Sequence, residues 1–185
     1  IVETALSGAM IGKGDFRHFM LKEIYEQPTV IGETLNTMLN PATQTITLPP
    51  LPFDFADITK VSIRACGTAY YSGLVRKYWI ESLGRPPVEI ELASEFRYRN
   101  MPMEADGLAL FISQSGETMD TLSALRYAAA QQQKIVSIVN VEESSIARES
   151  DAALRTLAGP EIGVASTKAF TTQLTVLACL AIACG

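Results

Sequence analysis

Apolar and polar positions alternate in blocks along the second part of this chain, and the lengths of the blocks predict its elements. After Asp57, short apolar runs are separated by longer stretches in which apolar residues recur every three or four positions. Short runs are typical of buried strands, and the longer stretches are typical of helices. The predicted strands are 60–66, 87–93, 107–113, 134–140 and 152–157, and the predicted helices are 68–83, 94–98, 118–132, 144–149 and a helix from about 164 onward.

This alternation of strands and helices predicts a doubly wound α/β domain. A parallel sheet needs a crossover between successive strands, and helical crossovers cover both of its faces. We therefore expect a five-stranded parallel sheet, and a flavodoxin-like strand order of 2-1-3-4-5 would place the first and third strands side by side. The domain is expected to occupy residues 57–185.

The residues before this domain predict a helical leader. Residues 1–17 are small and weakly patterned, as in a linker, whereas helical spacing extends from Phe19 to about Leu39. Pro28 is expected to divide this stretch into two helices or to begin the second one. The proline-rich residues 40–52 predict an irregular crossing with a short extended piece, so the leader and crossing together span residues 18–56.

Composition excludes several classes of protein. The chain has 185 residues and a net charge of −5, and its 15 Lys and Arg are scattered, so we expect no binding of nucleic acid or of an anionic membrane. The three cysteines lack metal-ligand spacing, which argues against a disulfide framework and a structural zinc site and favours the cytoplasm. The apolar run 174–184 is too short to span a bilayer and predicts a buried core helix.

The two ends of the sequence suggest a piece of a longer protein. The chain begins without Met, and its opening residues lack the basic region of a signal peptide. It stops at Gly185, inside or just after an apolar helix that a further element would be expected to cover.

Small polar residues follow the first and third predicted strands. CGTA (66–69) and SQSGET (113–118) are both strand-to-helix turns, and they would meet at the point where strand order reverses. The free N–H groups at a helix N-terminus favour an anion, and hydroxyl groups can donate hydrogen bonds to phosphate oxygens. The predicted contacts in these turns are Thr68, Ser113, Gln114, Ser115 and Thr118.

A simpler interpretation explains part of the same pattern. Ser115 or Thr118 could cap the following helix, and Gly116 could ease the turn. The stretch is neither a Walker A loop nor the GxGxxG fingerprint of dinucleotide-binding proteins. We therefore favour a cradle for a sugar phosphate over a nucleotide site and over simple caps.

A third polar stretch, residues 159–173, lies between the last strand and the apolar helix. It could form a rim that places backbone groups and the Ser166 hydroxyl against a sugar. It could equally be a capped helix start with Lys168 solvated or paired with Glu161. The pattern alone does not decide between the two.

These stretches also carry a family resemblance. FRHFMLKEIYEQP (16–28), ACGTAYYSGLV (65–75), ASEFRYR (93–99) and EIGVASTKAFTTQL (161–174) are similar to the isomerase part of the glucosamine-6-phosphate synthase family, the isomerizing glutamine:fructose-6-phosphate aminotransferases. SQSGET alone is typical of the wider sugar isomerase (SIS) fold. The resemblance covers the chain from about Phe16 to its end.

The resemblance implies a function. Members join a glutaminase domain to two SIS domains and make glucosamine 6-phosphate from fructose 6-phosphate and glutamine-derived ammonia, so this chain resembles the first SIS domain. The implied phosphosugar contacts are Thr68, Ser113, Gln114, Ser115 and Thr118, and Val164 and Ser166 match the sugar-side contacts. Ala69 departs from the family pattern, which usually has serine there, so only its N–H could take part.

The resemblance assigns the catalytic residues to the absent second SIS domain and C-terminal tail. The only histidine, His18, lies in the leader and is not expected to be catalytic. We therefore expect no catalytic residue, cofactor or metal in this chain, weak binding of sugar phosphate and no turnover by the piece alone. A homodimer is implied. A sugar-phosphate deaminase or deglycase and a non-catalytic sugar-phosphate sensor remain alternatives.

Overall fold

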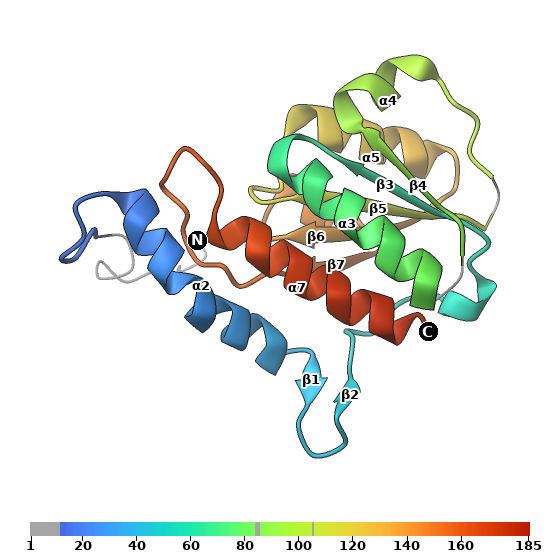
Figure 1. Ribbon diagram of the computed structural model, residues 1–185. Helices are drawn as coiled ribbons and strands as arrows, with labels where there is room; N and C mark the ends of the chain where they lie inside the picture. Colours follow the sequence, from blue (N-terminus) through green and yellow to red (C-terminus); the bar gives the residue numbers. More distant parts are fainter. Residues whose placement is uncertain (1–11, 84–85, 105) are drawn as a thin grey trace.

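A five-stranded parallel sheet forms the centre of the computed structural model, which describes residues 12–83, 86–104 and 106–185 (Figure 1). The strand order is β4-β3-β5-β6-β7, which is the predicted order 2-1-3-4-5. All five predicted strands are confirmed, with ends that differ by at most two residues. Their bounds are Val61–Ala65 (β3), Val88–Leu92 (β4), Leu108–Ser113 (β5), Lys134–Val139 (β6) and Ala152–Arg155 (β7).

The register places the carboxyl ends of β3 and β5 beside each other. Ala65, the last residue of β3, is level with Ile112 of β5. Ser113, the last residue of β5, is level with Val139 at the end of β6. The turns that follow β3 and β5 therefore open at the same edge of the sheet, as the sequence predicts.

Helices cover both faces of the sheet. α3 and α7 pack together over one face, and α4, α5 and α6 lie on the other (Figure 1). The bounds are Gly67–Leu83 (α3), Ala93–Arg99 (α4), Met119–Ala130 (α5), Ser145–Arg148 (α6) and Lys168–Ala183 (α7). The apolar run 174–184 is confirmed as a core helix, because Val176, Leu177 and Leu180 are fully or almost fully buried.

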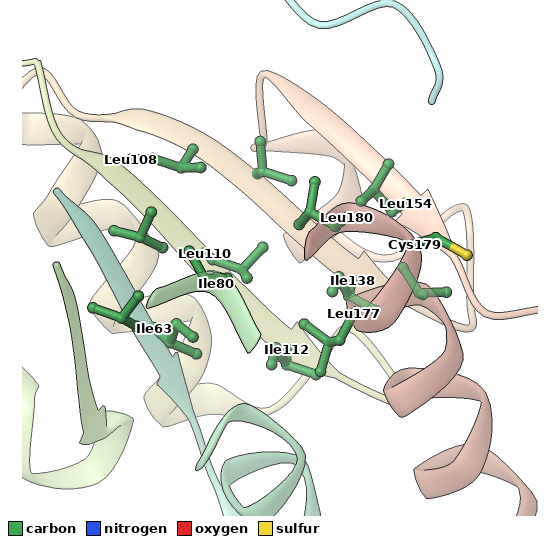
Figure 2. Packing of buried hydrophobic residues seen from close by; sticks show 14 of the residues in the cluster. Ile63, Ile80, Leu108, Leu110, Ile112, Ile138, Leu154, Leu177, Cys179 and Leu180 are labelled. Carbon is green, nitrogen blue, oxygen red and sulfur yellow. The ribbon is translucent and has the colours of Figure 1, made fainter. Parts of the chain in front are cut away.

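The central strand explains why its sequence is continuously apolar. In β5, Leu110 and Ile112 face α3 and α7, where they meet Ile80 and Leu177 (Figure 2). Phe111 faces the opposite layer of α4 and α5. Because both faces are covered, each position of the strand is buried, and each large apolar side chain contributes about 1.5–3 kcal/mol of burial.

The start of α7 corrects one prediction. The helix begins at Lys168, not near residue 164. The carboxylate of Glu161 accepts hydrogen bonds from the N–H groups of Thr167 at 2.8 Å and Ala169 at 3.2 Å. These N–H groups belong to the first turn, so Glu161 caps the helix at this point and leaves the preceding residues in a loop.

The leader corrects a second prediction, since α2 (Phe19–Asn36) is one continuous helix with Pro28 inside it. Proline lacks an N–H and cannot donate to the carbonyl of Ile24. The side-chain amide of Gln27 donates to that carbonyl instead, at 3.1 Å. The carbonyl of Ile24 therefore keeps a hydrogen-bond donor despite Pro28. Along its length, α2 packs against α7.

The crossing after α2 is more regular than predicted. β1 (Leu39–Asn40) and β2 (Thr45–Ile46) pair as a short antiparallel hairpin, and a 3-10 turn, Phe55–Asp57, leads into β3. Of the predicted linker, residues 1–11 lie outside the described part of the chain.

Candidate functional site

An open cavity of about 350 Å³ lies at the carboxyl ends of β3 and β5. It is bounded by the starts of α3 and α5 and by the loop 159–167, which we call the rim. All eight residues that the sequence singled out line this one cavity. They are Thr68, Ala69, Ser113, Gln114, Ser115, Thr118, Val164 and Ser166.

The turn after β5 holds its hydroxyl groups in a defined arrangement. The hydroxyl of Ser113 lies 3.0 Å from that of Thr118 and accepts a hydrogen bond from the N–H of Gly116 at 3.0 Å. Thr118 occupies the N-cap position of α5, but its side chain makes no capping hydrogen bond. The hydroxyl of Ser115 accepts from the N–H of Glu117 at 3.2 Å, which is a local turn contact. The simple capping interpretation therefore fails for Thr118.

Gly116 is required in this turn for two reasons. Its φ of +66° lies in the left-handed region, which side chains disfavour. A Cβ placed there would also lie 1.9 Å from the hydroxyl oxygen of Ser144. The turn therefore packs directly against the start of α6.

Glu117 does not line the cavity, and its side chain is turned toward the start of α6. Its carboxylate accepts a hydrogen bond from the N–H of Ser145 at 2.6 Å, and this bond lowers the pKa of Glu117. Arg148 lowers it further, to a smaller extent. The negative charge therefore sits at the start of α6, where the helix dipole favours it.

Two helix N-termini give the cavity its electrostatic character. α3 begins at Gly67, so Thr68 and Ala69 lie in its first turn with N–H groups that have no intrahelical acceptor. α5 begins at Met119, directly after Thr118. The lining within the described residues contains no Lys or Arg, so an anion here would be held by helix dipoles and hydroxyl groups.

The rim is fixed at its base by Asn140. The side-chain oxygen of Asn140 accepts from the N–H of Ala158 at 2.8 Å, and its amide donates to the carbonyl of Gly159 at 2.8 Å. Leu157, between these contacts and β7, has a φ of +49°, which is rare for a branched side chain. The chain therefore turns sharply after the last strand and returns toward the cavity.

The tip of the rim presents Val164 and Ser166 to the cavity. Val164 is fully exposed and Ser166 is half-buried, and the described residues give the Ser166 hydroxyl no partner. Lys168 corrects the alternative interpretation of this stretch. It is buried and pairs with Glu26 of α2 at 2.8 Å, so it is neither solvated nor paired with Glu161.

Further residues line the cavity that the sequence did not single out as contacts. Gln173 is 2% exposed, and its side-chain oxygen accepts from the hydroxyl of Ser72 at 3.3 Å. A polar amide within the apolar helix α7 is a signal that the sequence already contained. Only the fold shows that this side chain reaches the cavity. The others are Cys66, Gly67, Ile112, Glu161 and Gly163.

Few titratable side chains line the cavity within the described residues. Its titratable lining residues in the described part are Cys66 and Glu161, and one oxygen of Glu161 is already committed to two backbone N–H groups. Among the described residues, no cluster of His, Cys, Asp and Glu could hold a metal ion. In the same residues, no helix has the length and apolar character needed to cross a membrane.

Comparisons with known proteins agree with this geometry. Residues 54–183 match the family model of the SIS domain. The chain is 60% identical over 181 residues to the glutamine–fructose-6-phosphate aminotransferase (isomerizing) of Zymomonas mobilis, which covers 98% of this chain and 30% of that protein. The chain thus spans about 30% of the length of such relatives.

Two solved structures show the same arrangement. The C-terminal domain of the glucosamine-fructose-6-phosphate aminotransferase from Francisella tularensis superposes with a TM-score of 0.87 at 44% identity, over 94% of this chain and 49% of that one. The glucosamine-6-phosphate deaminase from Thermotoga maritima superposes with a TM-score of 0.72 at 25% identity, over 89% of this chain and 48% of that one.

Proposed function

This chain belongs to the SIS domain family, and from this premise we propose that it is the fructose-6-phosphate-binding part of an aminotransferase that makes glucosamine 6-phosphate. The observation that carries the proposal is the 60% identity to such an enzyme over 98% of this chain. The cavity supports it, because hydroxyl groups and two helix N-termini face the same open space.

In this proposal the phosphate of fructose 6-phosphate lies between the starts of α3 and α5. Thr68, Ser115 and Thr118 donate hydrogen bonds to it, and the two helix dipoles stabilise its negative charge. The absence of Lys and Arg from the described lining keeps the affinity modest, which suits a ligand that must leave after reaction. Ser113 orients Thr118 through their shared hydrogen bond.

The sugar extends from the phosphate toward the rim. Gln114 follows Ser113 directly, and its amide can both donate to and accept from sugar hydroxyl groups. Val164 and Ser166 form the other side of the sugar site. The product glucosamine 6-phosphate, which keeps the phosphate, binds in the same place.

The rest of the reaction belongs to parts of the protein outside this chain. Moving a proton between C2 and C1 of the sugar needs a general base. In this proposal the described lining binds the sugar phosphate and does not supply that base. We place residues 57–185 as the first SIS domain, residues 18–56 as its leader and residues 1–17 as a linker from a glutaminase domain. A second SIS domain supplies the catalytic residues, and the enzyme is a cytoplasmic homodimer.

A sugar-phosphate deaminase is the second candidate. The observation that favours it is the superposition on the glucosamine-6-phosphate deaminase from Thermotoga maritima. Such an enzyme would bind the same phosphosugar in the same cavity, so the cavity alone does not separate the two reactions. A sensor without catalysis is the third alternative.

An assay of the intact protein separates the three. We expect fructose 6-phosphate and glutamine together to yield glucosamine 6-phosphate and glutamate. Release of ammonia from glucosamine 6-phosphate, with no use of glutamine, would identify a deaminase. Tight binding of sugar phosphate with neither reaction would identify a sensor, and no binding of sugar phosphate would overturn the proposal itself.

A further inference from the structure

Glu23 of α2 is a buried carboxylate that binds two consecutive N–H groups of the rim. Its Oε1 accepts from the N–H of Ile162 at 2.6 Å and from the N–H of Gly163 at 2.9 Å. The residue is 2% exposed, and its Oε2 is buried with no partner among the described residues. A carboxylate removed from water in this way is stabilised by the hydrogen bonds it accepts, and charge-assisted bonds are the stronger kind.

The contact joins parts of the chain that are far apart in sequence. Glu23 lies 140 positions before Gly163 and outside the residues 54–183 that match the SIS domain. Glu26, on the next turn of α2, pairs with the buried Lys168 at the start of α7 at 2.8 Å. α2 is therefore fixed both to the rim and to α7, the helix that follows the rim (Figure 1).

Gly163 fits this contact because it has no side chain. A Cβ at this position would lie 2.5 Å from Oε2 of Glu23 and 3.4 Å from the Cα of Met20. The rim therefore approaches α2 as closely as the backbone allows. Any side chain here would have to move the rim, the carboxylate or both.

The structure assigns to Glu23 the role of a positioning residue for the sugar side of the cavity. By holding the N–H groups of Ile162 and Gly163, it sets where Gly163 and Val164 stand against the ligand, since both line the cavity. Glu23 does not itself line the cavity, so it acts through the rim. This inference rests on the proposed function, because it needs a sugar phosphate as the ligand.

The role predicts a selective loss of affinity. The phosphate site at the starts of α3 and α5 makes no contact with Glu23, so inorganic phosphate should bind equally well with or without it. The sugar end, in contrast, depends on the rim. If Glu23 had a purely structural role, its loss would lower thermal stability and weaken the binding of fructose 6-phosphate and of inorganic phosphate to the same extent.

The experiment compares variants of the intact enzyme by the KM for fructose 6-phosphate, the inhibition constant of inorganic phosphate and the thermal midpoint. We expect Glu23→Ala to raise KM by about tenfold or more, because two charge-assisted hydrogen bonds are lost, and to change the phosphate constant by less than about twofold. Glu23→Gln should recover part of the loss, since the carboxamide oxygen can still accept. Glu33→Ala, an exposed glutamate of the same helix, is the matched control and should change neither constant.

A second single variant, Gly163→Ala, keeps the inference testable if Glu23→Ala folds poorly, and a double-mutant cycle joins the two where Glu23→Ala folds. Gly163→Ala retains the carboxylate but forces the rim away from it, so it should also raise KM and spare the phosphate constant. In the Glu23→Ala background, Gly163→Ala should add less than about a twofold change, because the clash is gone. Independent effects of the two substitutions would contradict the assigned contact.

Two failures are distinguishable. If the unaltered enzyme does not bind fructose 6-phosphate, the proposed function is wrong. If it binds normally and both Glu23→Ala and Gly163→Ala leave KM unchanged, or shift both constants together, the positioning role of Glu23 is wrong and the proposed function stands.

Discussion

The hydroxyl oxygens of Ser113 and Thr118 lie 3.0 Å apart, one at the end of β5 and the other at the N-cap of α5. Both residues line the cavity, and Ser113 is almost fully buried, whereas Thr118 is half-buried. Because the hydroxyl of Ser113 also accepts a hydrogen bond from the N–H of Gly116, the Ser113 side chain has little freedom to rotate. The pair therefore holds a hydroxyl group at the mouth of the turn before any ligand arrives.

Removing the outer hydroxyl of this pair should weaken ligand binding. We expect Thr118→Ala to reduce the affinity for fructose 6-phosphate by about ten- to a hundredfold, since a hydrogen bond to a charged group contributes roughly 1.5–3 kcal/mol. Calorimetric titration checks this result. Ser123→Ala, on the same helix but outside the cavity lining, is the matched control. Equal affinities of all three proteins would remove Thr118 from the site.

Ala69 offers a gain-of-affinity test. It lines the cavity in the first turn of α3, where the family resemblance leads us to expect a serine. Ala69→Ser should lower the KM for fructose 6-phosphate by about fivefold, because one additional hydrogen bond contributes about 1 kcal/mol net. Steady-state kinetics of the intact enzyme measure this constant. An unchanged or raised KM would count against a phosphate at this helix start.

Gly116→Ala should destabilise the protein. The new side chain meets both a left-handed backbone and the hydroxyl of Ser144, and strain of this kind costs about 1–3 kcal/mol. Denaturant unfolding gives the free energy directly. Gly32→Ala in α2 is the contrast, because an added Cβ meets nothing within 4 Å apart from its chain neighbours and the backbone of its own helix. It should stabilise the protein by about 0.5–1 kcal/mol. Equal effects of the two would refute the packing of Gly116 on α6.

The hydrogen bond from Ser145 to Glu117 predicts a pH dependence. The folded pKa of Glu117 lies below its unfolded value, so the bond stabilises the fold above the unfolded pKa. This stability is lost as pH falls through the folded pKa. The thermal midpoint of the unaltered protein should therefore exceed that of Glu117→Gln at neutral pH, and the difference should shrink in acid. Glu33→Gln is the control, and a difference that grows in acid would contradict the assignment.

The sequence predicted the fold well because its signals were local. Each strand is a short apolar run, and the positions of the two polar turns followed from the strand order once β3 and β5 were expected to be neighbours. The predicted contacts in these two turns line one cavity for the same reason, whereas Val164 and Ser166 were implied by the family resemblance. Whether they bind a ligand remains a prediction.

The features that the sequence did not predict depend on distant contacts. Pro28 predicted a helix break. Only the position of the Gln27 amide shows how α2 continues past this residue. The sequence pattern predicted Lys168 to be solvated or paired with Glu161, but it is buried and pairs with Glu26, 142 positions away. The place of Gln173 beside the cavity and that of Glu23 against the rim depend on how α7 and α2 pack, which periodicity does not reveal.

The most direct test of the site is a crystal structure of this protein with fructose 6-phosphate bound. We expect the phosphoryl oxygens within hydrogen-bonding distance, roughly 3 Å, of the Thr118 hydroxyl and of N–H groups at the start of α3, with the sugar beneath Val164 and Ser166. A phosphoryl group bound at any other place on the molecule, or a sugar that points away from the rim, would contradict the account.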